Sequence, residues 1–246
     1  MDKKAFYGRL WNKLISFIRQ HKLINPTDKI LVAVSGGTDS VCLLDFLVKL
    51  SNKKSIEIVA CHVNHSIRGK DSDTDEKFTE NLCKKLGITF ISKKVDTYKF
   101  AREKRLSVEH AARTLRYRVL NQAAQKYDCN KVATAHHLDD HIETFMLNLL
   151  RSTSLKGLTG MPLKRKIAPK SKITIIRPLF CLTRKEIEGY LKYNKLKYRK
   201  DKTNKSLKFT RNWIRLELIP MIEKKQPQFK KHIFEISEKL SDVLNV

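Results

Sequence analysis

A glycine turn flanked by an acid and hydroxyl groups is the first feature of this sequence that could do chemistry. Residues 35–40 read Ser-Gly-Gly-Thr-Asp-Ser, between an apolar run at residues 30–34 and another at residues 41–47. This pattern predicts a buried strand, a tight turn and a helix start, where free N–H groups and the helix dipole favour an anion. A P-loop and a Rossmann fingerprint are excluded, because neither a Gly-Lys-Ser/Thr ending nor a third glycine is present.

A cluster of titratable residues stands where another apolar run ends. Residues 136–143 read His-His-Leu-Asp-Asp-His-Ile-Glu, and the spacing of Asp140 and Glu143 puts both acids on one helix face. Two such acids could hold a magnesium ion or an ammonium group. A capped helix with a solvated acidic face is the alternative. His137 and His141 have a spacing that suits zinc, but the zinc-protease glutamate and a third ligand are missing.

Two further segments carry polar groups. Glu109, Arg113 and Arg116 share one side of a predicted helix. Glu109 and Arg113 could form a surface pair, or Arg113 could clamp anionic oxygens at the phosphate edge. Residues 62–68, with Asp75 later, leave a second predicted strand at the same edge as the glycine turn. These segments therefore predict additional groups around one site.

Positive charge dominates the chain. The sequence has 51 Lys and Arg against 25 Asp and Glu, a formal net charge of +26. Such a field attracts polyanions, of which nucleic acid is the commonest large one, although a lysine-rich proteome is an alternative explanation. Arg211 and Arg215 follow a polar stretch at residues 201–204 and form a basic helix face that could contact an RNA backbone.

Alternating strands and helices must position these groups. The predicted strands are residues 29–34, 56–63, 88–95 and 131–135. The predicted helices are residues 38–51, 72–86, 107–127 and 138–150. This order predicts an α/β fold with a doubly wound, mainly parallel sheet, helices on both faces and further C-terminal helices. Ligands bind such sheets at the carboxyl ends of the strands, where both chemically rich segments begin.

The chain changes character after residue 151. Residues 152–172 have few apolar side chains and many lysines, and they predict a long loop that could cover the site. A short strand is expected at residues 173–176, and Thr183 with Glu186 forms a capping box for a helix that runs to Asn194. The remaining predicted helices are residues 207–219 and 229–244.

Length and composition allow one main core. The 246 residues, 41% hydrophobic, predict a catalytic domain over residues 1–220 and a helical extension over residues 221–246. An N-terminal amphipathic helix at residues 4–22 is expected to pack on that domain, with a targeting helix as the alternative.

Five dispersed cysteines without a CxxC pair disfavour an iron–sulfur site and suit a reducing cytoplasm. No apolar run approaches the ~20 residues of a membrane span.

The Ser-Gly-Gly-x-Asp-Ser turn resembles the PP-loop of the ATP pyrophosphatase superfamily, whose members cleave ATP between the α and β phosphates. Further segments resemble the tRNA(Ile)-lysidine synthetase family more specifically. The matching segments are residues 33–40, 62–68 with Asp75, 109–117, 133–162, 177–191 and 201–220. The resemblance implies a cytoplasmic ligase that uses ATP and Mg²⁺ to join free L-lysine to C2 of the wobble cytidine in tRNA(Ile) with a CAU anticodon. A C2-O-adenylate would be the intermediate, and AMP and pyrophosphate would leave.

The resemblance, together with the charge of the groups, also implies roles for individual residues. The expected catalytic groups are Asp39, Arg113, Asp140 and Glu143. The expected ATP-binding residues are Ser35, Gly36, Gly37, Thr38, Asp39, Ser40, His62, Asn64, Arg113 and His136. Mg²⁺ is expected on Asp39, and the lysine ammonium on Asp140 and Glu143. The expected tRNA-binding residues are Arg68, Arg151, Lys156, Arg211 and Arg215.

Two features depart from the family pattern. Lys205, Ser206 and Leu207 stand where an acid usually follows the position of Asn204. The chain also stops near the end of the family's catalytic domain, whereas longer members carry C-terminal domains that grip the tRNA. We therefore expect a short form or a piece of a longer chain, with a homodimer left open and no membrane partner.

Rival functions remain within and outside the superfamily. A tRNA thiolase is the nearest, but many thiolases need the clustered cysteines that this sequence lacks. Members that make GMP or NAD would not need so much positive charge. A noncatalytic RNA-binding protein with a relict nucleotide fold is the rival from another class.

Overall fold

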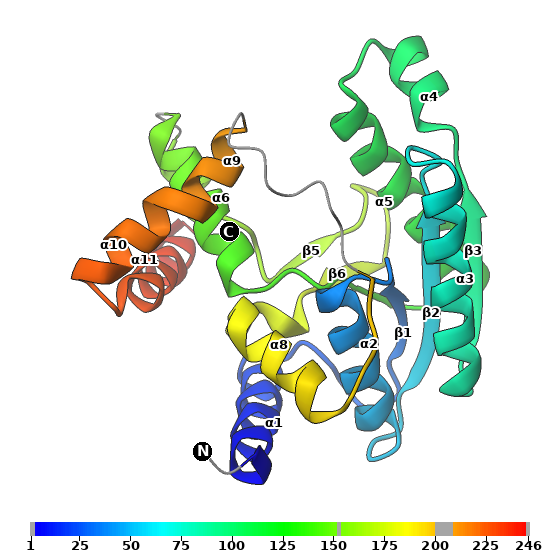
Figure 1. Ribbon diagram of the computed structural model, residues 1–246, viewed down its shortest axis with the longest axis horizontal. Helices are drawn as coiled ribbons and strands as arrows, with labels where there is room; N and C mark the ends of the chain where they lie inside the picture. The colour runs from blue at the N-terminus through cyan, green and yellow to red at the C-terminus, as the bar shows by residue number, and fades with distance from the viewer. Residues whose placement is uncertain (1–2, 152–153, 200–208, 245–246) are drawn as a thin grey trace.

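A six-stranded sheet with helices on both faces forms the body of the protein. The structure is a computed structural model that describes residues 3–151, 154–199 and 209–244. The strands lie in the order β3-β2-β1-β4-β6-β5, and every neighbouring pair is parallel except β5 with β6 (Figure 1). The strands are β1 (Lys29–Ala33), β2 (Glu57–Asn64), β3 (Thr89–Lys94), β4 (Lys131–Ala133), β5 (Lys164–Lys166) and β6 (Thr174–Ile176). The predicted fold class is confirmed.

The central strand β1 is apolar throughout its middle because helices cover both faces of the sheet. Ile30 and Val32 join a core with helices α1 (Lys3–Gln20), α2 (Thr38–Ser51) and α8 (Arg184–Tyr193). Leu31 points the other way and packs in a second core with α5 (Val108–Lys126). Alternate residues of one strand thus serve opposite faces, and burial on both sides explains the unbroken hydrophobic run.

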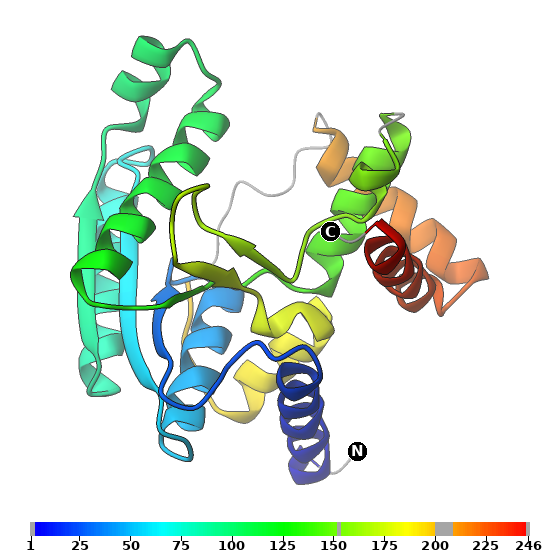
Figure 2. The same ribbon diagram turned by 180° about the vertical axis from the view of Figure 1, so that it is seen from behind.

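Helix α1 packs against α8 and the first core. Tyr7 stacks on Tyr193 with ring centroids 4.5 Å apart and lies 5.6 Å from Tyr190, both at the end of α8. Helices α3 (Lys70–Lys85) and α4 (Thr97–Lys104) belong to the β2–β3 side of the sheet, as Figures 1 and 2 show. Within the described part of the chain, no helix is long and apolar enough to cross a membrane.

A helical unit beside the sheet forms the third core. Ile142, Phe145 and Met146 of α6 (Leu138–Leu150) pack against helices from the end of the chain. Those helices are the π-helical η2 (Ile214–Leu218), α10 (Ile219–Lys225) and α11 (Phe229–Leu244). The expected boundary after residue 220 falls inside α10. The C-terminal helices therefore share a core with α6, the helix that carries the acidic cluster.

Most predicted elements are confirmed to within a few residues, but several differ. The sequence analysis missed α4, which is short and mostly polar. The expected loop at residues 152–172, described from residue 154, contains α7 (Leu155–Leu158) and the strand β5. The strand β5 reads Lys-Arg-Lys at the sheet edge, where charge blunts further pairing, and so it lacks an apolar signal.

The helix expected at residues 207–219 contains a π-helical stretch in the structure and continues past its expected end. Its described part consists of α9 (Thr210–Trp213) followed by η2. Residues 201–208, including the departure at Ser206, lie outside the described residues. A short 3-10 helix, η1 (Pro178–Cys181), follows β6, and the capping box of Thr183 and Glu186 opens α8 as expected.

Candidate active site

The glycine turn after β1 is held open by its own hydroxyl groups. Ser40 Oγ donates to Gly37 O at 3.0 Å and lies 3.1 Å from Ser35 Oγ. Gly36 has a φ of +83°, and a Cβ there would lie 3.2 Å from Thr79 Oγ1, so the turn needs glycine. Gly37 caps α2 without a side-chain acceptor. No capping side chain therefore competes with an anion for the N–H groups of the first turn.

A cavity of about 250 Å³ opens at this turn, along the carboxyl ends of the central strands. Of the expected ATP-binding residues, it is lined by Ser35, Gly37, Asp39, Ser40 and His136. The structure adds His65, Arg116, Tyr117 and Thr134 to its walls. The cavity thus lies where a doubly wound sheet is expected to bind its ligand.

The other expected ATP-binding residues do not line that cavity: Gly36, Thr38, His62, Asn64 and Arg113. His62 Nδ1 lies 2.8 Å from Val34 O, which fixes the end of β1 just before the turn. Asn64 Nδ2 donates to Asp73 and Glu76 at 2.9 and 2.7 Å. The structure uses both side chains to tie β2 to its surroundings, and their expected contact with ATP stays a prediction.

Asp39 is already engaged by a cation from a distant helix. Arg184 Nη1 donates to Asp39 Oδ1 and Oδ2 at 3.0 and 2.8 Å, and Arg184 Nη2 donates to Thr38 Oγ1 at 3.0 Å. The backbone N–H of Arg184 donates to Asp139 Oδ2 at 2.7 Å. Burial raises the pKa of Asp39, while His137 and Arg184 oppose that rise. The sequence analysis did not single out Arg184.

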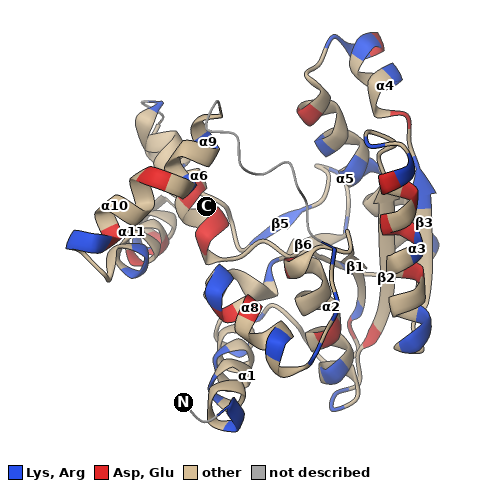
Figure 3. Cartoon of the chain, viewed as in Figure 1, with Lys and Arg blue, Asp and Glu red and all other residues tan. Residues whose placement is uncertain are grey.

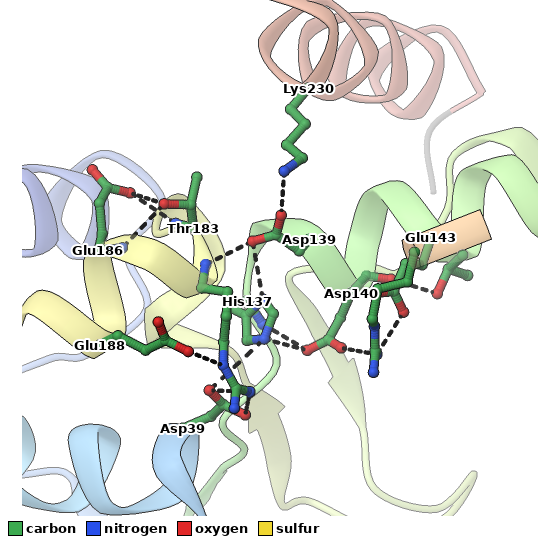
Figure 4. A network of polar contacts seen from close by, with 12 residues as sticks. Asp39, His137, Asp139, Asp140, Glu143, Thr183, Glu186, Glu188 and Lys230 are labelled. Carbon is green, nitrogen blue, oxygen red and sulfur yellow. Dashed lines mark hydrogen bonds and ion pairs between the residues drawn. The ribbon is translucent and has the colours of Figure 1, made fainter. Parts of the chain in front are cut away.

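His137 lies between the glycine turn and the acidic cluster (Figure 4). Its Nε2 is 3.8 Å from Asp39 Oδ1 and 3.5 Å from Asp140 Oδ2, and its Nδ1 is 3.6 Å from Asp139 Oδ2. The ring is buried, and Nδ1 has no hydrogen-bond partner in the described residues. His137 thus links three carboxylates from two elements.

Lys230 extends this network to the C-terminal helix. Lys230 Nζ lies 2.6 Å from Asp139 Oδ1 and 3.1 Å from Glu223 Oε2. His141 is on the same helix as Asp139, and its Nε2 lies 2.7 Å from Ser237 Oγ of α11. Two polar contacts therefore join α11 to the helix that carries the acidic cluster, which no local pattern predicted.

Glu143 is buried beneath two arginines. Its carboxylate accepts from Arg211 Nε at 2.8 Å and from Arg215 Nε and Nη2 at 2.5 and 2.9 Å. The Glu143 side chain is only 1% exposed, whereas the two arginines are about 40% exposed. Asp140 Oδ1 lies 3.9 Å from each of these arginines. The expected lysine-binding acids and two expected tRNA-binding arginines thus form one cluster.

Several arginines surround Tyr117, beside His136. The guanidinium groups of Arg165 and Arg113 lie 4.6 and 5.3 Å from the Tyr117 ring centroid. Arg177 is 1% exposed and donates to Pro162 O, but its Nε has no partner in the described residues. Burial, together with Arg177 nearby, lowers the pKa of His136 to about 3. Among the described residues no carboxylate pairs with these three arginines, so positive charge is unbalanced behind the cavity wall that Tyr117, Arg116 and His136 form.

Comparison with known proteins identifies the family. The family model of the PP-loop domain matches residues 9–222. The tRNA(Ile)-lysidine synthase of Petrotoga mobilis is 39% identical over 227 residues, which cover 92% of this chain and 70% of that protein. The chain belongs to the tRNA(Ile)-lysidine synthase family of PP-loop proteins. The resemblance inferred from the sequence is confirmed.

Other family members are longer than this chain. The synthase of Clostridium tetani is 40% identical over 233 residues, which cover 95% of this chain and 48% of the relative. The synthase of Clostridium perfringens strain 13 is 43% identical over 211 residues, or 86% of this chain and 44% of the relative. The chain therefore spans about half the length of several family members it matches.

Solved structures of distant proteins support the fold. The U34-tRNA thiolase NcsA from Methanococcus maripaludis matches with a TM-score of 0.79 at 22% identity, covering 98% of this chain and 80% of that one. An NH3-dependent NAD synthetase from Campylobacter jejuni matches with a TM-score of 0.53 at 14% identity, covering 98% of this chain and 97% of that one. At these identities the likeness shows the shared fold alone.

The remaining expected tRNA-binding residues lie away from the acidic cluster. Arg68 Nη2 donates to Asp75 Oδ2 at 2.8 Å, and Asp75 Oδ1 accepts from Arg199 Nε at 2.9 Å. Arg199 N donates in turn to Gly36 O at 2.9 Å, which ties this group to the PP-loop. Arg151 caps the far end of α6, and Lys156 lies on α7. Figure 3 shows further basic residues along β5 and α5.

Proposed function

We propose that this chain joins free lysine to C2 of the wobble cytidine of tRNA(Ile) with a CAU anticodon, and that ATP drives the reaction. One observation carries the proposal beyond family membership. His137 links the PP-loop acid Asp39 to Asp140, so a phosphate site and an acid pair share one edge of the sheet (Figure 4). Such proximity suits a reaction in which an adenylate made at one site meets an amine bound at the other.

The PP-loop suits the ATP phosphates. The N–H groups of its first turn, Arg116 on the cavity wall and the arginines beside Tyr117, Arg113 among them, would surround a triphosphate. Mg²⁺ is usually bound by one or two carboxylates together with substrate phosphates. Asp39, beside the anion site, fits that donor set and would hold the ion. When bound, the ion neutralises charge on the phosphates.

The first chemical step would make the adenylate. The cytidine O2 forms a bond to the α-phosphorus as the bond to the bridging oxygen of the β-phosphate breaks, and pyrophosphate leaves with the electron pair. Charge grows on the phosphate oxygens during this exchange. The backbone N–H groups at residues 37–40 and the guanidinium of Arg113 would stabilise that charge in place of water.

The second step would consume a lysine held by α6. Glu143 and Asp140 offer negative charge for an ammonium, whereas Arg211 and Arg215 offer positive charge for a carboxylate. A free amino acid carries both kinds of charge, so it could replace part of the internal ion-pair cluster. The ε-ammonium must lose a proton before its nitrogen attacks C2 and AMP leaves, and Asp140 would accept that proton.

The tRNA would approach along the basic surfaces. The formal net charge of +26 and the Lys-Arg-Lys edge strand β5 would attract the RNA backbone. Arg68, Arg151 and Lys156 would contribute contacts further out, and residues 154–172 would cover the cavity once the anticodon entered. A cytoplasmic location follows from this substrate.

The raised pKa values of the cysteine thiols argue against the rival function, that of a tRNA thiolase. Burial raises the pKa of Cys61, Cys83 and Cys181 to about 12 and that of Cys129 to about 11. Burial likewise raises the pKa of Cys42 well above its usual value. Sulfur transfer needs a reactive thiolate, and buried thiols with raised pKa values are poor ones.

A reconstituted reaction tests the proposal. The protein is incubated with a tRNA(Ile) transcript bearing the CAU anticodon, ATP, Mg²⁺ and lysine, and the digested RNA is analysed by mass spectrometry for a cytidine that carries lysine. Release of AMP and pyrophosphate should require both the tRNA and lysine. Turnover with ammonia or a sulfur donor instead of lysine would replace the proposal with amidation or thiolation.

A further inference from the structure

Arg184 forms an ion pair with Asp39, the acid that is expected to bind Mg²⁺. Arg184 is the first residue of α8, and its guanidinium contacts both carboxylate oxygens of Asp39 and the hydroxyl of Thr38. A guanidinium that contacts both carboxylate oxygens takes up part of their lone pairs, and its positive charge opposes a metal cation at the same carboxylate. If Asp39 binds Mg²⁺ with ATP, as in the proposed function, Mg²⁺ and Arg184 compete for its carboxylate.

The geometry also indicates where Arg184 would go. The Arg184 backbone is fixed, because its N–H donates to Asp139 Oδ2 at 2.7 Å at the start of the helix. Its side chain is 46% exposed, so solvent leaves room for the guanidinium to move once its present contacts are exchanged. The contact with Thr38 Oγ1 at 3.0 Å already holds the guanidinium at the first turn of α2, where the phosphates would bind. A planar guanidinium is well suited to two phosphate oxygens.

We infer that Arg184 transfers from Asp39 to the β- and γ-phosphates when ATP and Mg²⁺ bind, and that it stabilises the departing pyrophosphate. This inference rests on the proposed function. As the cytidine O2 bonds to the α-phosphorus, the electron pair of the broken bond passes to the pyrophosphate oxygen. Arg184 donates hydrogen bonds to that group and transfers no proton.

The exchange keeps Asp39 paired with a cation at each stage. Asp39 faces Arg184 and His137, with Asp140 nearby as a like charge. Arg184 balances Asp39 in the empty site, and Mg²⁺ balances it in the loaded one. Glu188, whose Oε1 lies 3.3 Å from Arg184 Nε, offers a weaker contact on the solvent side.

Binding measurements test the destination of Arg184 separately from catalysis. We expect Arg184→Ala to weaken the binding of inorganic pyrophosphate with Mg²⁺ about tenfold or more, the usual worth of a hydrogen bond to a charged group. The affinity for AMP, which lacks these phosphates, should not change. Arg184→Lys should weaken pyrophosphate binding less than Arg184→Ala does, because the lysine ammonium keeps the positive charge but cannot bind two phosphate oxygens as the planar guanidinium does. Equal weakening for AMP and pyrophosphate would overturn the inference.

The matched control is Lys13→Ala. Lys13 Nζ pairs with Glu186 Oε1 at 2.7 Å, so this variant removes another ion pair of α8 without touching the PP-loop. It should bind both ligands as the unchanged protein does. Pyrophosphate binding weakened equally by Lys13→Ala would mean that Arg184 matters only through the placement of α8.

A double-mutant cycle separates direct contact from support of Asp39. If Arg184 touches pyrophosphate, Arg184→Ala should weaken binding again in an Asp39→Asn background. If it acts only by holding Asp39, it should have no further effect there, and the inference fails. In single-turnover assays Arg184→Ala should also slow pyrophosphate release by about 10²–10³. If the unchanged protein releases no pyrophosphate with tRNA and lysine, the proposed function fails, while the binding results still stand.

Discussion

Replacing Glu143 by glutamine tests both the buried ion-pair cluster and its proposed use. The carboxylate is 1% exposed and accepts three hydrogen bonds from Arg211 and Arg215. A glutamine keeps one acceptor oxygen, loses the charge and turns an amide donor toward a guanidinium. The change therefore removes the negative charge of Glu143 from these hydrogen bonds, while Arg211 and Arg215 keep their positive charges.

The expected loss of stability follows from the exposure of the partners. Breaking a buried ion pair costs about 3–5 kcal/mol, but the two arginines are about 40% exposed, so water recovers part of their charge. We expect a loss of about 2 kcal/mol, which for a domain of this size lowers Tm by about 4–8 °C. Glu57→Gln is the control, because Glu57 pairs with Lys29 at the surface, and its Tm should not change.

The same variant tests lysine recognition by steady-state kinetics. If Glu143 faces the lysine ammonium, the lysine KM should rise at least about tenfold, the worth of one charge-assisted contact, while the ATP KM stays unchanged. A flat lysine KM with a raised ATP KM would assign Glu143 to the phosphate site. An unchanged Tm would refute the reasoning about the buried cluster.

Four further predictions concern other parts of the molecule. Gly36→Ala should abolish nucleotide binding, since φ is +83° and its Cβ would press on Thr79, whereas Gly8→Ala in open space should leave calorimetric ATP binding intact. Burial lowers the pKa of His141 to about 4 from the 6.5 of the unfolded chain, so stability should fall as pH drops from about 6.5 to 4; His141→Gln should show a shallower slope of Tm against pH, and an equal slope would contradict this. The affinity for tRNA should fall steeply with salt, and Arg165→Ala should reduce the slope of log K against log salt by about 0.7 if it contacts a phosphate of a single-stranded loop, but not otherwise. Ornithine should support AMP release about 10–200-fold less well than lysine, because one methylene is worth ~1–3 kcal/mol, and equal rates would exclude a pocket that measures length.

Local sequence patterns determined most of the scaffold. The glycine turn, the apolar strands and the capping box of Thr183 and Glu186 are confirmed because each depends on residues close together in the chain. The family was also readable, since its motifs are contiguous segments that fold in place. The short, mostly polar α4 and the charged edge strand β5 were missed because they bury too little apolar surface to leave a pattern.

The tertiary structure alone decided which charges meet. Arg215 reaches Glu143 across 72 residues, and Arg184 reaches Asp39 across 145. In the sequence, Arg215 looked like part of a basic RNA-facing helix, and Arg184 was simply the residue after a helix cap. Ion pairs of this kind have no periodicity, because any acid in a chain with 51 basic residues has many candidate partners. Only the packing of α6 against the C-terminal helices, and of α8 beside the PP-loop, selects one partner for each.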